Sequence, residues 1–480
     1  MRGVISAAGY VPYHRLDRSE IAAFFGSGSG QGRRAVASYD EDTTTMGHAA
    51  ADLALRSTPV KPVAVWFATS APAYLEKTNA AAIHAALRLD PAVGALDFGG
   101  AIRSGIGALR TALAAGGPTL VVAADRRDGP PTGADEAAAG DGAAALLVGD
   151  GSDGPVLAEY LGAASRTVEV TERWRTPGEA RSRSWEERLG AHVLGPVGAE
   201  ALHAALVDSG LGDTAGIDRL AVTGLNSRAV AAAVKAIGAE PSSIVDPLID
   251  TVGNTATAHP ALLLCSALEQ ASPGETVAVV ALADGAEAVI LRATDELADH
   301  RPIAPVSAQM AAGGPVSYGR FLAWRRMVDV EPPNRPPPNR PSSPAAHRRT
   351  GWKYGFTGSR DRSSEMVHLP PARVSEKGGA ADDMEPESMA HTTGTVRSFT
   401  VDRLAYSPSP PTVFAVVDFD GGGRAPLELT DVDAGEVHVG LRVVPTFRRL
   451  YTADEIHNYF WKARPARAGE AAGTQAGAAK

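Results

Sequence analysis

Residues 97–107, which read Asp-Phe-Gly-Gly-Ala-Ile-Arg-Ser-Gly-Ile-Gly, constrain the fold more than any other stretch of the chain. The start of the segment predicts a buried strand, the Gly-Gly-Ala step predicts a tight turn, and the residues that follow predict a helix. A chain that runs from a buried strand through a tight turn straight into a helix is typical of a layered α/β protein.

The rest of the first 295 residues follows the same alternation of strand and helix. Short apolar runs are each bounded by Gly, Pro or charged residues, as expected for buried strands. The expected strands are 63–69, 119–124, 143–148, 219–223 and 276–282. The expected helices are 79–89, 105–115, 199–209, 228–237 and one after Pro260.

Length, charge and cysteine content exclude several classes of protein. At 480 residues the chain has room for two or three domains, and its formal net charge of −9 favours neither nucleic acid nor an anionic membrane as partner. Neither a membrane-spanning apolar run nor a signal-peptide pattern is present in the sequence, which predicts a cytoplasmic protein. The single cysteine, Cys265, excludes an intrachain disulfide and a cysteine-rich metal site.

A proline-rich break separates this region from the C-terminal part. Residues 331–344 read Glu-Pro-Pro-Asn-Arg-Pro-Pro-Pro-Asn-Arg-Pro-Ser-Ser-Pro, which predicts an extended spacer; a ligand for a proline-recognition module is the alternative. Residues 318–330 before it predict an amphipathic helix. After it, short strands at 394–401, 412–419, 425–430 and 442–447 predict a small closed barrel.

Four segments of the first 290 residues, in this order, resemble the thiolase superfamily, above all hydroxymethylglutaryl-CoA synthase and ketoacyl-carrier-protein synthase III. They are an acidic helix start at 40–46, the turn at 97–107, a glycine-rich strand entry at 140–145 and the loop 253–255. The resemblance implies a layered thiolase fold of two pseudo-repeated α/β halves. The expected parts are halves at 1–160 and 161–330, a linker at 331–350, a zinc-ribbon-like segment at 351–392, an OB-fold at 393–465 and a disordered tail at 466–480.

The same resemblance implies where the chemistry of the family would lie. The acyl-carrying cysteine corresponds to Ile102, the histidine to Thr223 and the acidic residue to Ser70, while the asparagine is kept as Asn254. Isoleucine cannot attack a thioester. The frame of an acyltransferase is therefore expected without its nucleophile, which indicates specialised rather than housekeeping metabolism.

Three functions are compatible with this expectation. The first is non-covalent chemistry on an acyl-CoA or carrier-bound thioester, such as making or breaking a carbon–carbon bond or transferring an acyl group. Asn254 would donate a hydrogen bond to the thioester oxygen, and His259 would carry the proton unless it packs at a helix start. Thr223, Ser70 and Ser104 are further polar candidates, and Arg103 would bind a ligand carboxylate or form an ion pair with Asp97 or Glu41.

The second function is that of a non-catalytic acyl-thioester-binding partner, as a homodimer or as a heteromer with a thiolase-fold relative. Trp174 and Arg175 lie in a long excursion that resembles the segment shaping the acyl-CoA side of the site in hydroxymethylglutaryl-CoA synthases. The third function, a synthase that uses Cys265, is disfavoured because this cysteine lies in an apolar helical run typical of a core.

The C-terminal part resembles the OB-fold proteins that partner thiolases, which often carry a zinc ribbon before the barrel. A structural zinc requires four soft ligands in a tetrahedron. The candidate ligand positions hold Asp361, Ser364, Ser375 and Gly378, and His368 stands alone nearby. We therefore expect no zinc, no other metal and no cofactor besides the acyl thioester itself.

Overall fold

The computed structural model describes residues 1–26 and 30–467, and the chain divides into two compact units. The N-terminal unit comprises Met1–Ala37, Asp42–Ala81 and Asp90–Tyr318, and the C-terminal unit comprises Ser38–Glu41, Ala82–Leu89 and Gly319–Lys480. Most of the predicted disordered tail, residues 468–480, lies outside the described residues. Among the described residues, no helix is both long and apolar enough to cross a membrane.

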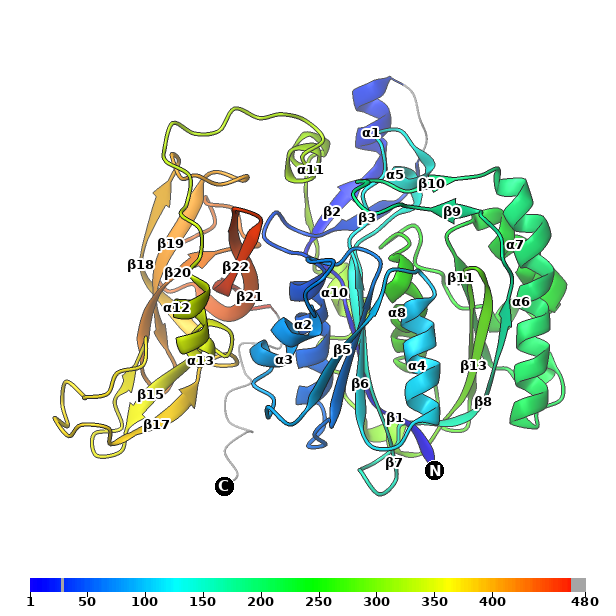
Figure 1. The fold of residues 1–480 in the computed structure, drawn as a ribbon, viewed down its shortest axis with the longest axis horizontal. Helices are drawn as coiled ribbons and strands as arrows, with labels where there is room; N and C mark the ends of the chain where they lie inside the picture. Colours follow the sequence, from blue (N-terminus) through cyan, green and yellow to red (C-terminus); the bar gives the residue numbers. More distant parts are fainter. Residues whose placement is uncertain (27–29, 468–480) are drawn as a thin grey trace. The chain divides into compact units, whose positions relative to one another are not determined.

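A nine-stranded sheet with the order β11-β12-β13-β8-β1-β7-β6-β4-β5 forms the frame of the N-terminal unit (Figure 1). Its strands are β1 Arg2–Tyr10, β4 Ala64–Thr69, β5 Gly94–Gly99, β6 Thr119–Asp125, β7 Gly142–Asp150, β8 Ala158–Thr167, β11 Arg219–Gly224, β12 Thr276–Leu282 and β13 Gly285–Ala293. The five strands for which the sequence predicts residue ranges in this region are all present. Each forms because its apolar run is buried on both faces of the sheet.

The sheet consists of two halves with the same strand order. In the first half the order is β5-β4-β6-β7-β1, with β4 parallel to β5 and β6 and with β6 antiparallel to β7. In the second half β11 is parallel to β12, β12 and β13 are antiparallel, and an isolated parallel bridge from Leu220 to Ile244 stands where β5 stands in the first half. β1 and β8 join the halves through Gly3 and Val4. The predicted α/β fold of two repeated halves is confirmed.

Helices complete the layers of this unit. α4 and α8 contact strands of both halves and form the middle layer, α2 covers β1, β6 and β7, and α6 with α7 covers the second half (Figure 1). The helices that make these layers are α2 Thr43–Arg56, α4 Ser104–Ala114, α6 Glu187–Ser209, α7 Ser227–Ile237 and α8 His259–Leu268. The core between them is built from Leu, Val and Ala side chains such as Leu109, Val121 and Leu262.

One predicted helix is much longer than expected. α6 begins at Glu187, twelve residues before the predicted start at 199, and continues through Pro196. Proline disfavours a helix interior because it lacks an N–H and its ring clashes with the preceding turn. The buried residues Leu194 and Leu202, one on each side of the proline, show that packing against the sheet outweighs this local penalty.

The C-terminal unit contains a closed barrel with the order β18-β19-β20-β22-β21. Its strands are β18 Gly394–Asp402, β19 Thr412–Phe419, β20 Arg424–Leu429, β21 Arg442–Ala453 and β22 Ile456–Pro465. Four of them match the predicted strands, and β22 was not predicted. A second small sheet, β16-β15-β17, is formed by β15 Thr357–Asp361, β16 Val367–His368 and β17 Met384–Ser388.

The proline-rich stretch differs from its prediction at its C-terminal end. Residues 331–342 contain neither helix nor strand, but α12 spans Ser343–Arg348 inside the predicted linker, and α13 follows at Thr350–Lys353. Ser342 caps α12 by accepting a hydrogen bond from the N–H of Ala345, and Pro344 occupies the first turn, where proline is tolerated. The amphipathic helix predicted for 318–330 is shorter than expected: α11 spans Tyr318–Trp324.

A buried ionic cluster lies inside the C-terminal unit. Lys462 of β22 is fully buried and pairs with Asp40 at 2.9 Å and with Glu428. Burial alone would lower the pKa of Lys462, but the two carboxylates raise it above its usual value. Arg448, also buried, pairs with Glu41 and with Asp431. Segment 38–41 therefore supplies two of the four carboxylates that pair with these buried cations.

We predict that Lys462→Met destabilises the C-terminal unit by about 3–5 kcal/mol, because Asp40 and Glu428 would remain buried without their partner. Arg340→Met is the matched control, since the Arg340–Asp454 pair is mostly exposed and should contribute less than about 1 kcal/mol. Urea unfolding of the full chain, followed by tryptophan fluorescence, measures both. Equal stabilities of the two variants would contradict a structural role for the cluster.

Candidate functional site

The strand, turn and helix predicted for residues 97–107 are present, but the strand is not buried as predicted, because β5 is the last strand of the sheet and all its residues are at least partly exposed. β5 ends at Gly99, Gly100 adopts a φ of +87°, which favours glycine, and α4 begins at Ser104. The Ser104 hydroxyl donates a hydrogen bond to the Gly99 carbonyl at 3.2 Å. Ile102 stands on this turn, immediately before the N-terminus of α4.

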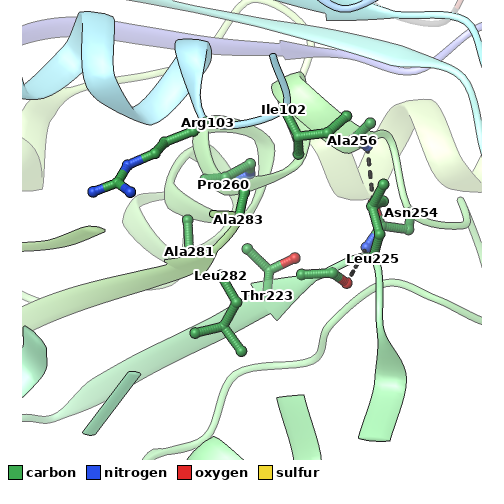
Figure 2. A pocket seen from close by; sticks show the side chains of 11 residues that line it. Ile102, Arg103, Thr223, Leu225, Asn254, Ala256, Pro260, Ala281, Leu282 and Ala283 are labelled. Atoms are coloured by element: carbon green, nitrogen blue, oxygen red, sulfur yellow. Dashed lines mark hydrogen bonds between the residues drawn. The ribbon is translucent and has the colours of Figure 1, made fainter. Parts of the chain in front are cut away.

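Ile102 lines a small, half-open pocket in the N-terminal unit. Its side chain converges with those of Thr223, at the end of β11, and Asn254 (Figure 2). The remaining lining residues are Arg103, Gly224, Leu225, Ala256, Pro260, Ala281, Leu282 and Ala283. The structure thus brings four of the predicted site residues, Ile102, Arg103, Thr223 and Asn254, into one lining from segments far apart in the sequence.

Backbone groups hold Asn254 in place. Its side-chain N–H donates to the Gly224 carbonyl at 3.0 Å, and its side-chain oxygen accepts from the N–H of Ala256 at 2.9 Å (Figure 2). A primary amide has two N–H donors, so a second donor remains for a ligand besides the bond to Gly224. The amide of Asn254 is thus held in a fixed orientation, and its hydrogen bond to a thioester oxygen stays a prediction.

Arg103 points away from Ile102 and Asn254 (Figure 2). Its guanidinium donates to Glu287 on β13 at 2.8 Å and to the hydroxyl of Ser165, so the ion-pair alternative is the one observed, with an unpredicted partner. Asp97, one of the partners considered, instead accepts hydrogen bonds from the N–H groups of Asn79 and Ala80. The guanidinium of Arg103 is engaged by its own chain and fixes the start of α4 against β13.

His259 does not belong to the lining, although it was predicted as a proton carrier. It is 1% exposed at the start of α8. Its Nδ1 accepts from the N–H of Thr255 at 3.2 Å, which places the proton on Nε2, and Nε2 donates to the Pro247 carbonyl at 3.1 Å. Burial lowers the pKa of His259 to about 4, so the ring is neutral at pH 7. His259 therefore packs at the start of a helix, which was the alternative to its predicted role as proton carrier.

Ser70 lies outside the lining as well and is held by a buried carboxylate that the sequence analysis missed. The Ser70 hydroxyl donates to Asp125 at 2.9 Å, and Asp125 also accepts from the Thr69 hydroxyl and from the N–H of Thr257. Asp125 is the last residue of β6 and is fully buried. A carboxylate at the carboxyl end of a parallel strand was the available signal, since such ends gather the polar residues of α/β proteins.

The remaining candidate residues lie outside the lining of the pocket. Trp174 belongs to the two-stranded sheet β9 Arg173–Trp174 with β10 Arg183–Ser184, and Arg175 donates to the carbonyl of Ser70. Neither residue is among those that line the pocket. Cys265 is buried in α8, and burial raises the pKa of its thiol, which makes it a poor nucleophile.

The pocket as a whole is suited to binding an uncharged group. Within the described lining, Arg103 is the one charged side chain, and it is paired with Glu287. Asn254 supplies an amide donor and Thr223 a hydroxyl, whereas Ile102, Leu225 and the alanines supply apolar contacts. This arrangement can hold an apolar chain and orient a carbonyl oxygen.

Comparisons with known proteins agree with the fold. The chain is 26% identical over 345 residues to the hydroxymethylglutaryl-CoA synthase of Methanopyrus kandleri, covering 68% of this chain and 97% of the relative. It is 27% identical over 353 residues to that of Aeropyrum pernix, covering 68% and 95%. The family model of the ChsH2 C-terminal OB-fold domain matches residues 388–448.

Solved structures share the thiolase-type fold. MvaS in complex with 3-hydroxy-3-methylglutaryl coenzyme A superimposes with a TM-score of 0.56 at 19% identity, over 70% of this chain and 94% of that one. The curacin HMG synthase in complex with apo donor-ACP gives 0.57 at 18%, over 68% and 89%. FabH from Pseudomonas aeruginosa gives 0.50 at 20%, over 61% and 98%.

We predict that Gly105→Ala destabilises the N-terminal unit by about 1–3 kcal/mol. A Cβ at Gly105 would overlap the carbonyl oxygen of Thr257, so α4 would have to move away from the loop that carries Asn254. Gly107→Ala, in the same helix but facing open space, should stabilise it by about 0.5–1 kcal/mol. Thermal unfolding of both variants tests the contact, and a stabilised Gly105→Ala variant would refute it.

Proposed function

We propose that this chain, a thiolase-fold homologue of the hydroxymethylglutaryl-CoA synthases with a C-terminal OB-fold domain, binds an acyl thioester without forming an acyl-enzyme. The observation that carries the proposal is Ile102, whose hydrocarbon side chain stands between β5 and the N-terminus of α4 and faces the pocket. A thiol there would be activated by the helix N-terminus. Isoleucine has no group to activate and leaves the wall apolar.

The lining of the pocket supports an acyl thioester as the group that it contacts. A short acyl chain would contact Ile102 and Leu225, and the thioester oxygen would accept the free N–H of Asn254. Relatives solved with 3-hydroxy-3-methylglutaryl coenzyme A and with an acyl carrier protein make both carriers candidates.

A non-catalytic binding role is favoured over catalysis. Chemistry beside a thioester requires a group that moves a proton. Within the described lining no carboxylate, imidazole or amine is present, and the nearby His259 is buried with both ring nitrogens occupied. The chain would then position an acyl thioester for a thiolase-fold relative.

Non-covalent carbon–carbon bond chemistry is the second candidate function. Asn254 and Thr223 favour it, because two fixed polar groups beside a thioester oxygen can stabilise an enolate. Because the described lining holds no carboxylate, imidazole or amine, the proton would have to pass to or from the second substrate or the thioester itself.

We predict that the purified chain binds a short acyl-CoA reversibly and that its mass does not change. Asn254→Ala should weaken binding about tenfold, since one hydrogen bond to the ligand contributes about 0.5–1.5 kcal/mol and the loop loses its anchor to Gly224. Thr111→Ala, on the exposed side of α4, is the matched control. Calorimetry measures the affinity and intact-protein mass spectrometry the adduct.

The possible outcomes separate the candidates. A stable acyl adduct on the wild-type chain would contradict the proposal, as would the absence of acyl-CoA binding together with an unaffected Asn254→Ala variant. Ile102→Cys should acquire an acyl adduct if the pocket still presents thioesters to this position. Turnover of an acyl-CoA by the wild type would favour the second candidate function.

We further propose that the N-terminal unit associates with a second copy of itself through the edge of its sheet. β5 is the last strand of the sheet, every one of its residues is at least partly exposed, and Leu96 is 56% exposed. An open strand edge that offers backbone donors and acceptors together with apolar side chains is suited to pairing. A thiolase-fold relative with the same edge is the alternative partner.

We predict that Leu96→Lys shifts the wild-type dimer toward the monomer by at least tenfold in dissociation constant. Charged side chains on an edge oppose strand pairing and would be buried in the interface. Val207→Lys is the control, because Val207 is 65% exposed on α6. Sedimentation velocity measures both, and a monomeric wild-type chain would contradict the homodimer.

A further inference from the structure

The segment that resembles a zinc ribbon contains two tight turns that face each other. In the first, the N–H of Asp361 donates to the carbonyl of Met366, and the N–H of Glu365 donates to the carbonyl of Asp361. In the second, the N–H of Gly379 donates to the carbonyl of Ser375. The four residues at the candidate ligand positions, two from each turn, are thereby brought to one place.

A carboxylate occupies the centre of this place. Oδ2 of Asp361 accepts hydrogen bonds from the Ser363 hydroxyl at 2.9 Å, from the N–H of Ser364 at 3.0 Å and from the Ser364 hydroxyl. Asp361 is fully buried, and the Ser364 hydroxyl lowers the pKa of its carboxyl, so the group is ionised at pH 7. Asp361 thus organises the first turn as an acceptor for three donors.

Hydroxyl groups and a histidine connect the two turns. The Ser375 hydroxyl lies 3.5 Å from the Ser364 hydroxyl and 3.2 Å from Nε2 of His368, and it also accepts from the N–H of Lys377 at 3.2 Å. Ser375 is 3% exposed and His368 is 9% exposed. A chain of hydrogen bonds therefore runs from Asp361 through Ser364 to Ser375 and His368.

This arrangement does not fit a zinc ion. Structural zinc prefers thiolate and imidazole ligands in a tetrahedron, whereas these positions offer a carboxylate, two hydroxyls and a glycine. As long as Asp361 is present, a side chain at the fourth position also has no room, because a Cβ at Gly378 would overlap Oδ2 of Asp361 and lie 2.8 Å from the Ser363 hydroxyl.

We propose that the Asp361–Ser364–Ser375–His368 hydrogen-bond chain takes the place of a metal ion as the cross-link between the two turns, so that this segment folds without zinc. Buried hydrogen bonds can fill this role because each buried partner left alone would lose its solvation. The cross-link connects the turn after β15 to the segment before β17, and so closes the small sheet of the C-terminal unit.

Proteolysis of the full chain tests this proposal directly. Arg362 and Lys377 are exposed trypsin sites, one in each turn. We expect Asp361→Ala and Ser375→Ala to accelerate cleavage at both sites more than tenfold. Asp382→Ala, which removes the exposed ion pair with Arg373 in the same segment, should change it less than threefold. Cleavage of Asp361→Ala at the wild-type rate would overturn the proposal.

Metal measurements supply the second arm. Wild-type protein should contain less than 0.1 zinc per chain, and EDTA should leave its cleavage rate unchanged. Near-stoichiometric zinc, with faster cleavage after EDTA, would overturn the proposal. The variant Asp361→Cys/Ser364→Cys/Ser375→Cys/Gly378→Cys should bind one zinc and regain resistance to trypsin only with the metal. Failure to bind zinc would show that the four positions do not converge as described.

Discussion

The carboxylate of Asp125 is the constraint on which the candidate site depends. It accepts hydrogen bonds from residues on both sides of the pseudo-repeat: Thr69 and Ser70 come from the first half, and Thr257 comes from the second. Because Asp125 is fully buried, leaving these donors unpaired would be costly, and the loop of Asn254 is therefore held against the end of β6. The pocket forms where the two halves are joined in this way, with Ile102 from one half and Asn254 and Thr223 from the other.

Such a scaffold persists when its chemistry changes, because packing depends on shape whereas catalysis depends on a few groups. Gly105 still lets α4 approach the Thr257 carbonyl, and the turn at Gly100 still places residue 102 at the start of the helix. Apart from Arg103, which is paired with Glu287, the described lining offers an amide and a hydroxyl rather than a carboxylate, imidazole or thiol. This is why we propose that the pocket holds a thioester rather than transforming one.

Sequence reasoning succeeded where local pattern and burial coincide. β12 and β19 lie at their predicted boundaries because their apolar runs are buried and clearly bounded. It failed where a strand or the partner of a side chain depends on a residue in another segment of the chain. β22 was missed because Lys462 interrupts its apolar pattern, and the carboxylate that makes this lysine acceptable in the core comes from Asp40, more than 400 residues away. The partners of Arg103 and His259 were hidden for the same reason, since Glu287 and Pro247 belong to other segments.

The participation of residues 38–41 and 82–89 in the C-terminal unit has a consequence for the architecture of the gene product. Although the proline-rich stretch resembles a simple joint between two modules, severing the chain there would not yield two complete pieces. The C-terminal piece would keep Lys462 and Arg448 but lose Asp40 and Glu41, which pair with them. The C-terminal unit is thus completed by a peptide from the start of the chain, so a fragment that begins at the proline-rich stretch would need this peptide added back.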